Sequence, residues 1–189
     1  MLFRSSFFNQ PQAAEANYHM FWSALRPLLE GNGEAQARLD QLRAGFAEAM
    51  QQELEAMWAR KLGLNAPDAD LVNDLLQLMA TSGVDYTIFF RRLSDTPAHL
   101  FALEESFYLP CPEELKGPWS AWLQRWRQRL SEAGDPRATA ATMKQVNPAI
   151  TWREWLIAPA YEQAAQGDSG LIQELQGVFS HPYEIGRAH

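Results

Sequence analysis

Residues 119–130 read Trp-Ser-Ala-Trp-Leu-Gln-Arg-Trp-Arg-Gln-Arg-Leu, with large apolar side chains at intervals of three and four. The apolar members of this stretch share one side of a helix: Trp119, Trp122, Leu123, Trp126 and Leu130. Arginines and glutamines occupy the opposite side. We therefore expect a helix over 119–133 that buries its tryptophan-rich stripe.

The same helical period recurs outward in both directions, whereas strand patterns are nearly missing and the chain has only four valines. We predict further helices over 12–29, 34–62, 68–80, 85–93, 151–166 and 168–180, another that Asp135-Pro136 starts and Asn147-Pro148 stops, and a brief turn starting at 96. Residues 107–118 hold three prolines and one glycine, which predicts a loop. The fold prediction is all-α: an irregular helical array in a single domain, 1–189, with a hinge near 107–118.

The composition excludes several classes of protein. The formal net charge of −7 argues against binding to a phosphate backbone, so we expect no nucleic-acid partner. No stretch approaches the roughly 20 apolar residues that span a bilayer, and residues 1–11 do not resemble a signal peptide. Cys111 is the only cysteine, so no intrachain disulfide can form, and we expect a cytoplasmic protein without a membrane partner.

Residues that could carry chemistry are scattered along the chain. The histidines at 19, 99, 181 and 189 do not show the spacing of metal ligands, and Cys111 has no base near it in sequence. Gly167-Asp168-Ser169-Gly170 spells the letters around the nucleophile of trypsin-like proteases, but it separates two predicted helices, where Asp168 is better explained as an N-cap. The chain has no glycine-rich phosphate loop and no kinase catalytic motif. We predict no catalytic, cofactor-binding or metal-binding residue.

Two features allow more than one interpretation. Seven tryptophans and ten phenylalanines form either the core or an exposed surface that docks on another domain. The segment 83–93 packs Asp85, Tyr86, Thr87, Arg91 and Arg92 close together. It is either a capped helix with an anchoring ion pair, in which an arginine meets an acid or stacks on a tryptophan, or a binding surface.

Several segments, in order, resemble the C-terminal part of the selenoprotein O (SelO) family. They are Asn9-Gln10-Pro11 with Asn17, Lys61-Leu62-Gly63-Leu64, Asp85-Tyr86-Thr87 with Phe90-Arg91, Met143 to Asn147-Pro148, Arg153, Gly167-Asp168 and Pro182-Tyr183-Glu184. Ala16 and Glu154 stand where the family usually has Trp and Asn, and the Cys or selenocysteine tail of many members is missing.

The resemblance implies a protein-kinase-like fold and an enzyme that transfers AMP from ATP to protein hydroxyl groups, a nucleotidyltransferase that uses ATP and Mg²⁺. It also implies that the catalytic residues lie upstream of the segment that begins at Asn9. The motif residues of this chain are then structural: Asn9, Gln10, Pro11, Asn17, Lys61, Gly63, Asp85, Tyr86, Thr87, Arg91, Asn147, Pro148, Arg153, Gly167 and Asp168.

Two functions stay open at this point. The chain is either the truncated, C-terminal half of such an adenylyltransferase, inactive on its own and partnered by the missing catalytic half in cis or in trans, or a stand-alone helical module that binds another protein. An unrelated helical protein with its own small-molecule pocket is the weaker third interpretation.

Overall fold

The computed structural model describes residues 10–132 and 134–184, and it confirms the all-α prediction for them. The helices are α1 (Gln10–Leu25), the 3-10 helix η2 (Arg26–Leu29), α2 (Gly33–Ala44), α3 (Phe46–Leu62), α4 (Ala69–Ser82), α5 (Tyr86–Leu93), the 3-10 helix η3 (Leu100–Ser106), α6 (Glu113–Ser131), α7 (Pro136–Val146), α8 (Glu154–Ala165) and α9 (Gly170–Phe179). Within these residues the one β contact is an isolated antiparallel bridge between Val84 and Phe107. The chain forms two compact units that divide between Ala56 and Met57, within α3.

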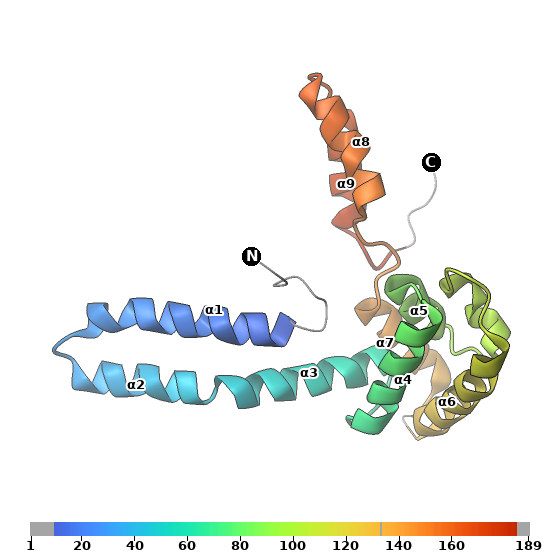
Figure 1. Cartoon of the computed structure of the whole chain (residues 1–189), viewed down its shortest axis with the longest axis horizontal. Helices are drawn as coiled ribbons and strands as arrows, with labels where there is room; N and C mark the ends of the chain where they lie inside the picture. Colours follow the sequence, from blue (N-terminus) through green and yellow to red (C-terminus); the bar gives the residue numbers. More distant parts are fainter. Residues whose placement is uncertain (1–9, 133, 185–189) are drawn as a thin grey trace. The chain divides into compact units, whose positions relative to one another are not determined.

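The first unit is a helical hairpin in which α1 and α2 lie side by side (Figure 1). Trp22 of α1 is buried, and its indole N–H donates a hydrogen bond of 3.1 Å to Asp40 of α2. The guanidinium of Arg43 lies 4.5 Å from the Trp22 ring centroid, close enough for a cation–π contact. The side chain of Asn32 caps the start of α2 by accepting the Ala35 N–H. The buried ring of Trp22 thus joins the two helices.

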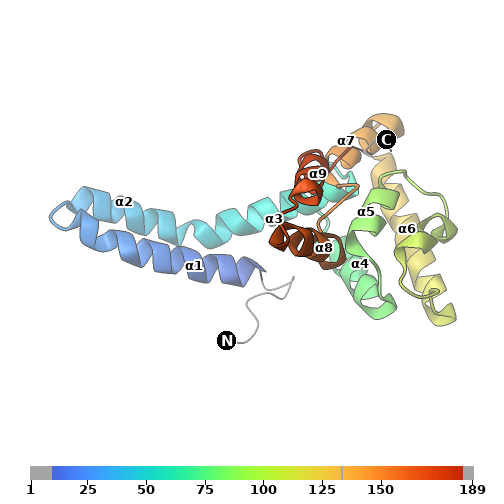
Figure 2. The same ribbon diagram turned by 90° about the horizontal axis from the view of Figure 1, so that it is seen from above.

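The second unit is built around the tryptophan stripe of α6, as the sequence predicts. Trp119, Trp122 and Trp126 are buried, and each indole N–H has an acceptor: Ser82 Oγ, the Leu71 carbonyl and the Leu62 carbonyl, at 3.1, 2.9 and 2.9 Å. These acceptors lie on α4 and at the end of α3, so α6 packs against both. Figure 2 shows α4, α5 and α6 together in this unit. Core filling therefore explains this part of the aromatic content.

The predicted helix over 34–62 is wrong in one detail, because Gly45 divides it into α2 and α3. The backbone at Gly45 stays near helical values, with φ −81° and ψ −7°, and hydrogen bonds of the helical type continue on both sides. Glycine is a poor helix former, and α2 has no buried residue that could hold the turn in place. The period of the apolar residues alone does not reveal such a break.

The predicted loop over 107–118 is too long, since α6 already begins at Glu113 and contains Pro118. Proline removes one backbone donor near the start of the helix. The acidic Glu113 and Glu114 in the first turn favour the helix dipole, and the buried stripe that follows stabilises the rest. The turn expected at residue 96 begins instead at Leu100, and α8 begins at Glu154 rather than at 151.

We predicted one domain over 1–189 with a hinge near 107–118, and this stays a prediction. Residues 107–118 all lie within the second unit. None of the helices in the described residues is long and apolar enough to cross a bilayer.

Candidate functional site

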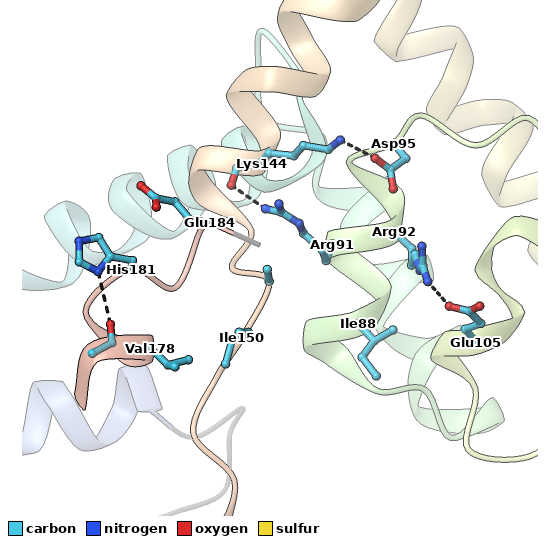
Figure 3. A pocket seen from close by; sticks show the side chains of 12 residues that line it. Ile88, Arg91, Arg92, Asp95, Glu105, Lys144, Ile150, Val178, His181 and Glu184 are labelled. Carbon is cyan, nitrogen blue, oxygen red and sulfur yellow. Dashed lines mark hydrogen bonds and ion pairs between the residues drawn. The ribbon is translucent and has the colours of Figure 1, made fainter. Parts of the chain in front are cut away.

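An open groove of about 740 Å³ runs along α5 and past the ends of α7 and α9 (Figure 3). We call it the α5–α9 groove. The residues that line it are Ile88, Arg91, Arg92, Asp95, Glu105, Lys144, Ala149, Ile150, Gly177, Val178, His181 and Glu184. Its size falls within the range of ligand pockets. We therefore take this groove as the candidate site of the second unit.

The groove is lined by residues of two ion pairs and by apolar residues of α5, of α9 and of the segment between α7 and α8. Arg92 pairs with Glu105, and Lys144 pairs with Asp95 at 2.6 Å. Both pairs are exposed, so each contributes roughly 0–1 kcal/mol. No serine, threonine or cysteine is among the described residues that line the groove, so it does not pair such a nucleophile with a base.

Asp85 is the polar centre of the segment 83–93. Its carboxylate caps α5 by accepting the Ile88 N–H at 3.0 Å, which confirms the predicted N-cap. It also accepts hydrogen bonds from Arg153 at 2.8 Å and from the Tyr108 hydroxyl at 3.0 Å. Burial alone would raise the pKa of Asp85, but these hydrogen bonds and the charge of Arg153 together hold it below its usual value. Asp85 is therefore ionised at neutral pH.

Arg91 joins α5 to the end of α7. Its Nη1 donates hydrogen bonds to the carbonyl oxygens of Lys144 and Asn147, at 3.0 and 3.1 Å. The last carbonyls of a helix lack partners within the helix and attract a cation, so Arg91 caps α7. The sequence suggested that one of the two arginines pairs with an acid or stacks on a tryptophan, and Arg92, which pairs with Glu105, confirms this.

Asn147 is fully buried and connects the ends of three helices. Its Nδ2 donates to the Lys61 carbonyl at 2.8 Å and to Ser94 Oγ at 3.0 Å. Its Oδ1 has no hydrogen-bond partner among the described residues. An unsatisfied buried acceptor costs about 1–3 kcal/mol. The two bonds from Nδ2 fix the end of α7 against α3 and α5.

Lys61, in the last turn of α3, is buried with its amine against aromatic rings. Its Nζ lies 4.5 Å from the ring centroid of Phe90 and 5.0 Å from that of Tyr86. Burial lowers the pKa of Lys61 to about 8. No carboxylate in the described part of the chain forms a salt bridge with it. Its aromatic contacts join α3 to α5.

Gly63 ends α3 in a left-handed conformation, with φ +69°. The Leu64 N–H bonds back to the Ala59 carbonyl at 2.9 Å, as in a Schellman cap. A Cβ at Gly63 would lie 2.7 Å from the sulfur of Met143. The Lys61–Leu64 segment therefore both ends a helix and allows α7 to approach closely.

The remaining motif residues lie at helix ends or within helices. Gln10 and Pro11 begin α1, Asn17 lies within it, Tyr86 and Thr87 form the first turn of α5, Pro148 follows α7, and Gly167 and Asp168 join α8 to α9. Asn9 falls outside the described residues. The predicted N-cap at Asp168 is displaced by one residue: Ser169 is the N-cap of α9, while Asp168 Oδ1 accepts the Gly170 N–H at 2.8 Å. Arg91 lines the groove, and so do Lys144 and Glu184 from two other segments that resemble the family.

Other potentially reactive groups do not form a centre in this part of the protein. In residues 10–132 and 134–184, no three His, Cys, Asp or Glu side chains gather as they would around a metal ion. Cys111 is half-buried, and burial raises the pKa of its thiol. A protonated thiol is a weak nucleophile.

Two hydrogen-bonding partners in the structure, Tyr108 and Ser94, were not predicted from the sequence. They meet Asp85 and Asn147 across 23 and 53 residues of chain. The apolar residues Ile88, Ile150 and Val178 of the groove were also missed. No local pattern marks such contacts, because they depend on how helices pack.

These features define an all-helical protein whose polar motif residues join helix ends beside an open groove. A family model described as protein adenylyltransferase SelO matches residues 2–179. Curated relatives called protein nucleotidyltransferase YdiU are 33% identical in Cronobacter sakazakii and 35% identical in Stutzerimonas stutzeri, over 95% and 96% of this chain. The relative in Pseudomonas aeruginosa is 34% identical over 96% of the chain.

The chain belongs to the SelO family. It spans about 36% of the length of these relatives.

Proposed function

We propose that this chain is the C-terminal helical part of a SelO-type protein adenylyltransferase, with a kinase-like fold in the complete enzyme. In this proposal the chain is inactive alone and supports the part that binds ATP and Mg²⁺ and transfers AMP to protein hydroxyl groups. That part acts in cis or in trans. A reducing cytoplasm is the expected setting, which the single cysteine favours.

One observation carries the proposal: the charged and amide side chains shared with the family are engaged in joining helices. Asp85 binds Arg153, Arg91 binds the end of α7, and Asn147 binds the Lys61 carbonyl. A nucleotide-transfer centre needs carboxylate or amide oxygens for the metal and cations aimed at the phosphates. These residues are occupied in other ways.

A transfer assay tests the first half of the proposal. The chain is incubated with Mg²⁺ and ATP labelled at the α-phosphate, with and without a general acceptor protein, beside a heat-denatured control. We expect no protein-bound label above that control. Clear self-labelling by the folded chain would overturn the proposal.

A chimaera tests the second half. The matching region of the Cronobacter sakazakii relative, which aligns over 186 residues, is replaced by this chain. We expect the chimaera to be labelled in the same assay, whereas the relative lacking that region is not. A folded chimaera with no transfer would show that this chain does not serve as that part of the enzyme.

A second candidate function is a stand-alone module that binds another protein, and two exposed rings favour it. Trp152 and Trp155, which flank Arg153, are 67% and 71% exposed. Aromatic side chains of this kind are common at binding surfaces. If the module interpretation holds, the chimaera fails and the isolated chain captures a partner that Trp152→Ala together with Trp155→Ala no longer retains.

A further inference from the structure

The α8–α9 hairpin has few connections to the rest of the second unit. α8 and α9 lie side by side and contact each other (Figure 1), and Leu156 and Leu175 are half-buried. The amides of Ala149 and Ile150 both donate to the Pro182 carbonyl, at 2.7 and 3.3 Å, which closes the base of the hairpin. We call residues 149–184 the arm and residues 57–147 the body. Most of the arm's hydrogen bonds are thus internal.

Arg153 is the exception. In the described structure, Arg153 is the one residue of the arm whose side chain forms a hydrogen bond or ion pair with the body, through Asp85 and the neighbouring Tyr108. Its guanidinium lies 2.8 Å from Asp85 Oδ1, and the Asp85 side chain is 8% exposed while that of Arg153 is 33% exposed. A charge-assisted bond to a buried carboxylate is stronger than an exposed pair.

Between the body and the arm, one residue, Pro148, separates the backbone that is hydrogen-bonded to the body from the backbone that is hydrogen-bonded within the arm. Asn147 belongs to the body, because its side chain binds Lys61 and Ser94 and its carbonyl accepts from Arg91. Ala149 belongs to the arm, because its amide binds Pro182. Pro148 lies between them, so rotation about its neighbouring bonds would move the arm without breaking either set of hydrogen bonds.

The α5–α9 groove lies between these parts. Ile88, Arg91 and Lys144 line it from the body, whereas Val178 and His181 line it from the arm (Figure 3). Ile88 and Val178 remain 41% and 38% exposed although they line the same cavity. The side chains that line the groove from the two parts are therefore not tightly packed, as expected where two parts can separate.

We propose that the α8–α9 hairpin is an arm with its hinge at Pro148, and that the Asp85–Arg153 ion pair holds this arm against the body. We call this ion pair the latch. With the latch closed, the arm forms one wall of the groove. With the latch open, that wall moves away and the apolar residues of the groove become accessible. The inference concerns this chain alone and does not depend on the proposed function.

Distance measurements between two spin labels test the latch. Labels are attached to Gln128→Cys on α6 and Glu162→Cys on α8, both exposed positions, in a Cys111→Ser background. We expect one dominant distance in this protein. Arg153→Gln, which removes the ion pair from the exposed side, should raise the population of other distances about tenfold or more, as for loss of a charged hydrogen bond.

Further variants separate the latch from general damage. Asp85→Asn keeps an oxygen that can cap α5 but lacks the charge, and should shift the distances as Arg153→Gln does; Arg153→Lys should fall between Arg153→Gln and the parent. Arg125→Gln breaks an ion pair of 2.5 Å with Asp74 inside the body and should change nothing. Equal distances with and without Arg153, or the same broadening in Arg125→Gln, would overturn the proposal. Circular dichroism verifies that each variant is folded.

Discussion

Replacing Gly63 with alanine tests how closely α7 presses on the end of α3. The added Cβ would lie 2.7 Å from both Met143 Sδ and Thr139 Cγ2, and the backbone φ is +69°. A left-handed conformation costs a non-glycine residue about 1–2 kcal/mol, and overpacking adds about 1–3 kcal/mol. Met143 is fully buried and cannot turn into solvent. We expect Gly63→Ala to lower the free energy of unfolding by about 2–5 kcal/mol.

Gly83→Ala is a matched control for this prediction. Gly83 also ends a helix in the left-handed region, with φ +66°, but a Cβ added there would have no atom of the described residues within 4 Å. Gly83→Ala should therefore lower the free energy of unfolding by the backbone cost alone, about 1–2 kcal/mol. Urea unfolding of the full chain, followed by the blue-shifted fluorescence of the buried tryptophans, gives both values. If Gly63→Ala and Gly83→Ala lower the free energy of unfolding by amounts equal within about 0.5 kcal/mol, the packing argument is refuted. It is also refuted if the extra loss caused by Gly63→Ala stays the same in a Met143→Ala background.

Three further predictions concern buried polar groups. Because the folded pKa of Asp85 lies below its usual value, its stabilising effect is present above pH ~4 and is lost as the pH falls through the folded pKa. The stability difference between the parent and Asp85→Asn, measured by urea unfolding, should therefore shrink from pH 7 to pH 3, and a constant difference contradicts this. Because the pKa of Lys61 is about 8 when folded and 10.5 ordinarily, the unfolded state binds more protons between these values. As the pH rises through that range, the free energy of unfolding of the parent should therefore increase by up to about 3 kcal/mol relative to that of Lys61→Met. A difference between the two proteins that does not change with pH in the same assay argues against a buried amine. Trp122→Phe keeps a ring but leaves the Leu71 carbonyl without its indole donor; it should cost about 1–3 kcal/mol in thermal unfolding, and a neutral effect would show that this hydrogen bond does not stabilise the fold.

Local signals were enough to predict most helices of the second unit. Asp68, Asp85 and Asp135 each accept a backbone N–H at the start of a helix, as expected for N-caps. The tryptophan stripe of α6 is buried as its spacing predicts. These features depend on residues within one or two turns of each other, so the sequence contains them directly. Gly45 and Pro118 were mispredicted because neighbouring packing decides whether a helix continues through such residues.

The partners of the polar residues could not be predicted in the same way. Arg153 meets Asp85 across 68 residues and Asn147 meets Lys61 across 86. The expected pairing of an arginine with an acid is confirmed for Arg92, whereas the bonds of Arg91 to the last carbonyls of α7 follow from no local pattern. The α5–α9 groove was equally hidden, since its wall residues come from four separate segments. Contacts of this kind follow from helix packing, which periodicity does not specify.

Three of the shared polar residues, Asp85, Arg153 and Asn147, have one physical property in common: each lies where a helix begins or ends. Asp85 precedes α5, Arg153 precedes α8, and Asn147 follows α7. Helix ends carry backbone groups without partners and a partial charge, so polar side chains there stabilise the fold without taking part in chemistry. An aspartate, an arginine and an asparagine in one region would otherwise suggest an active site. Their hydrogen bonds here join helix ends to one another, which agrees with the supporting role that we propose.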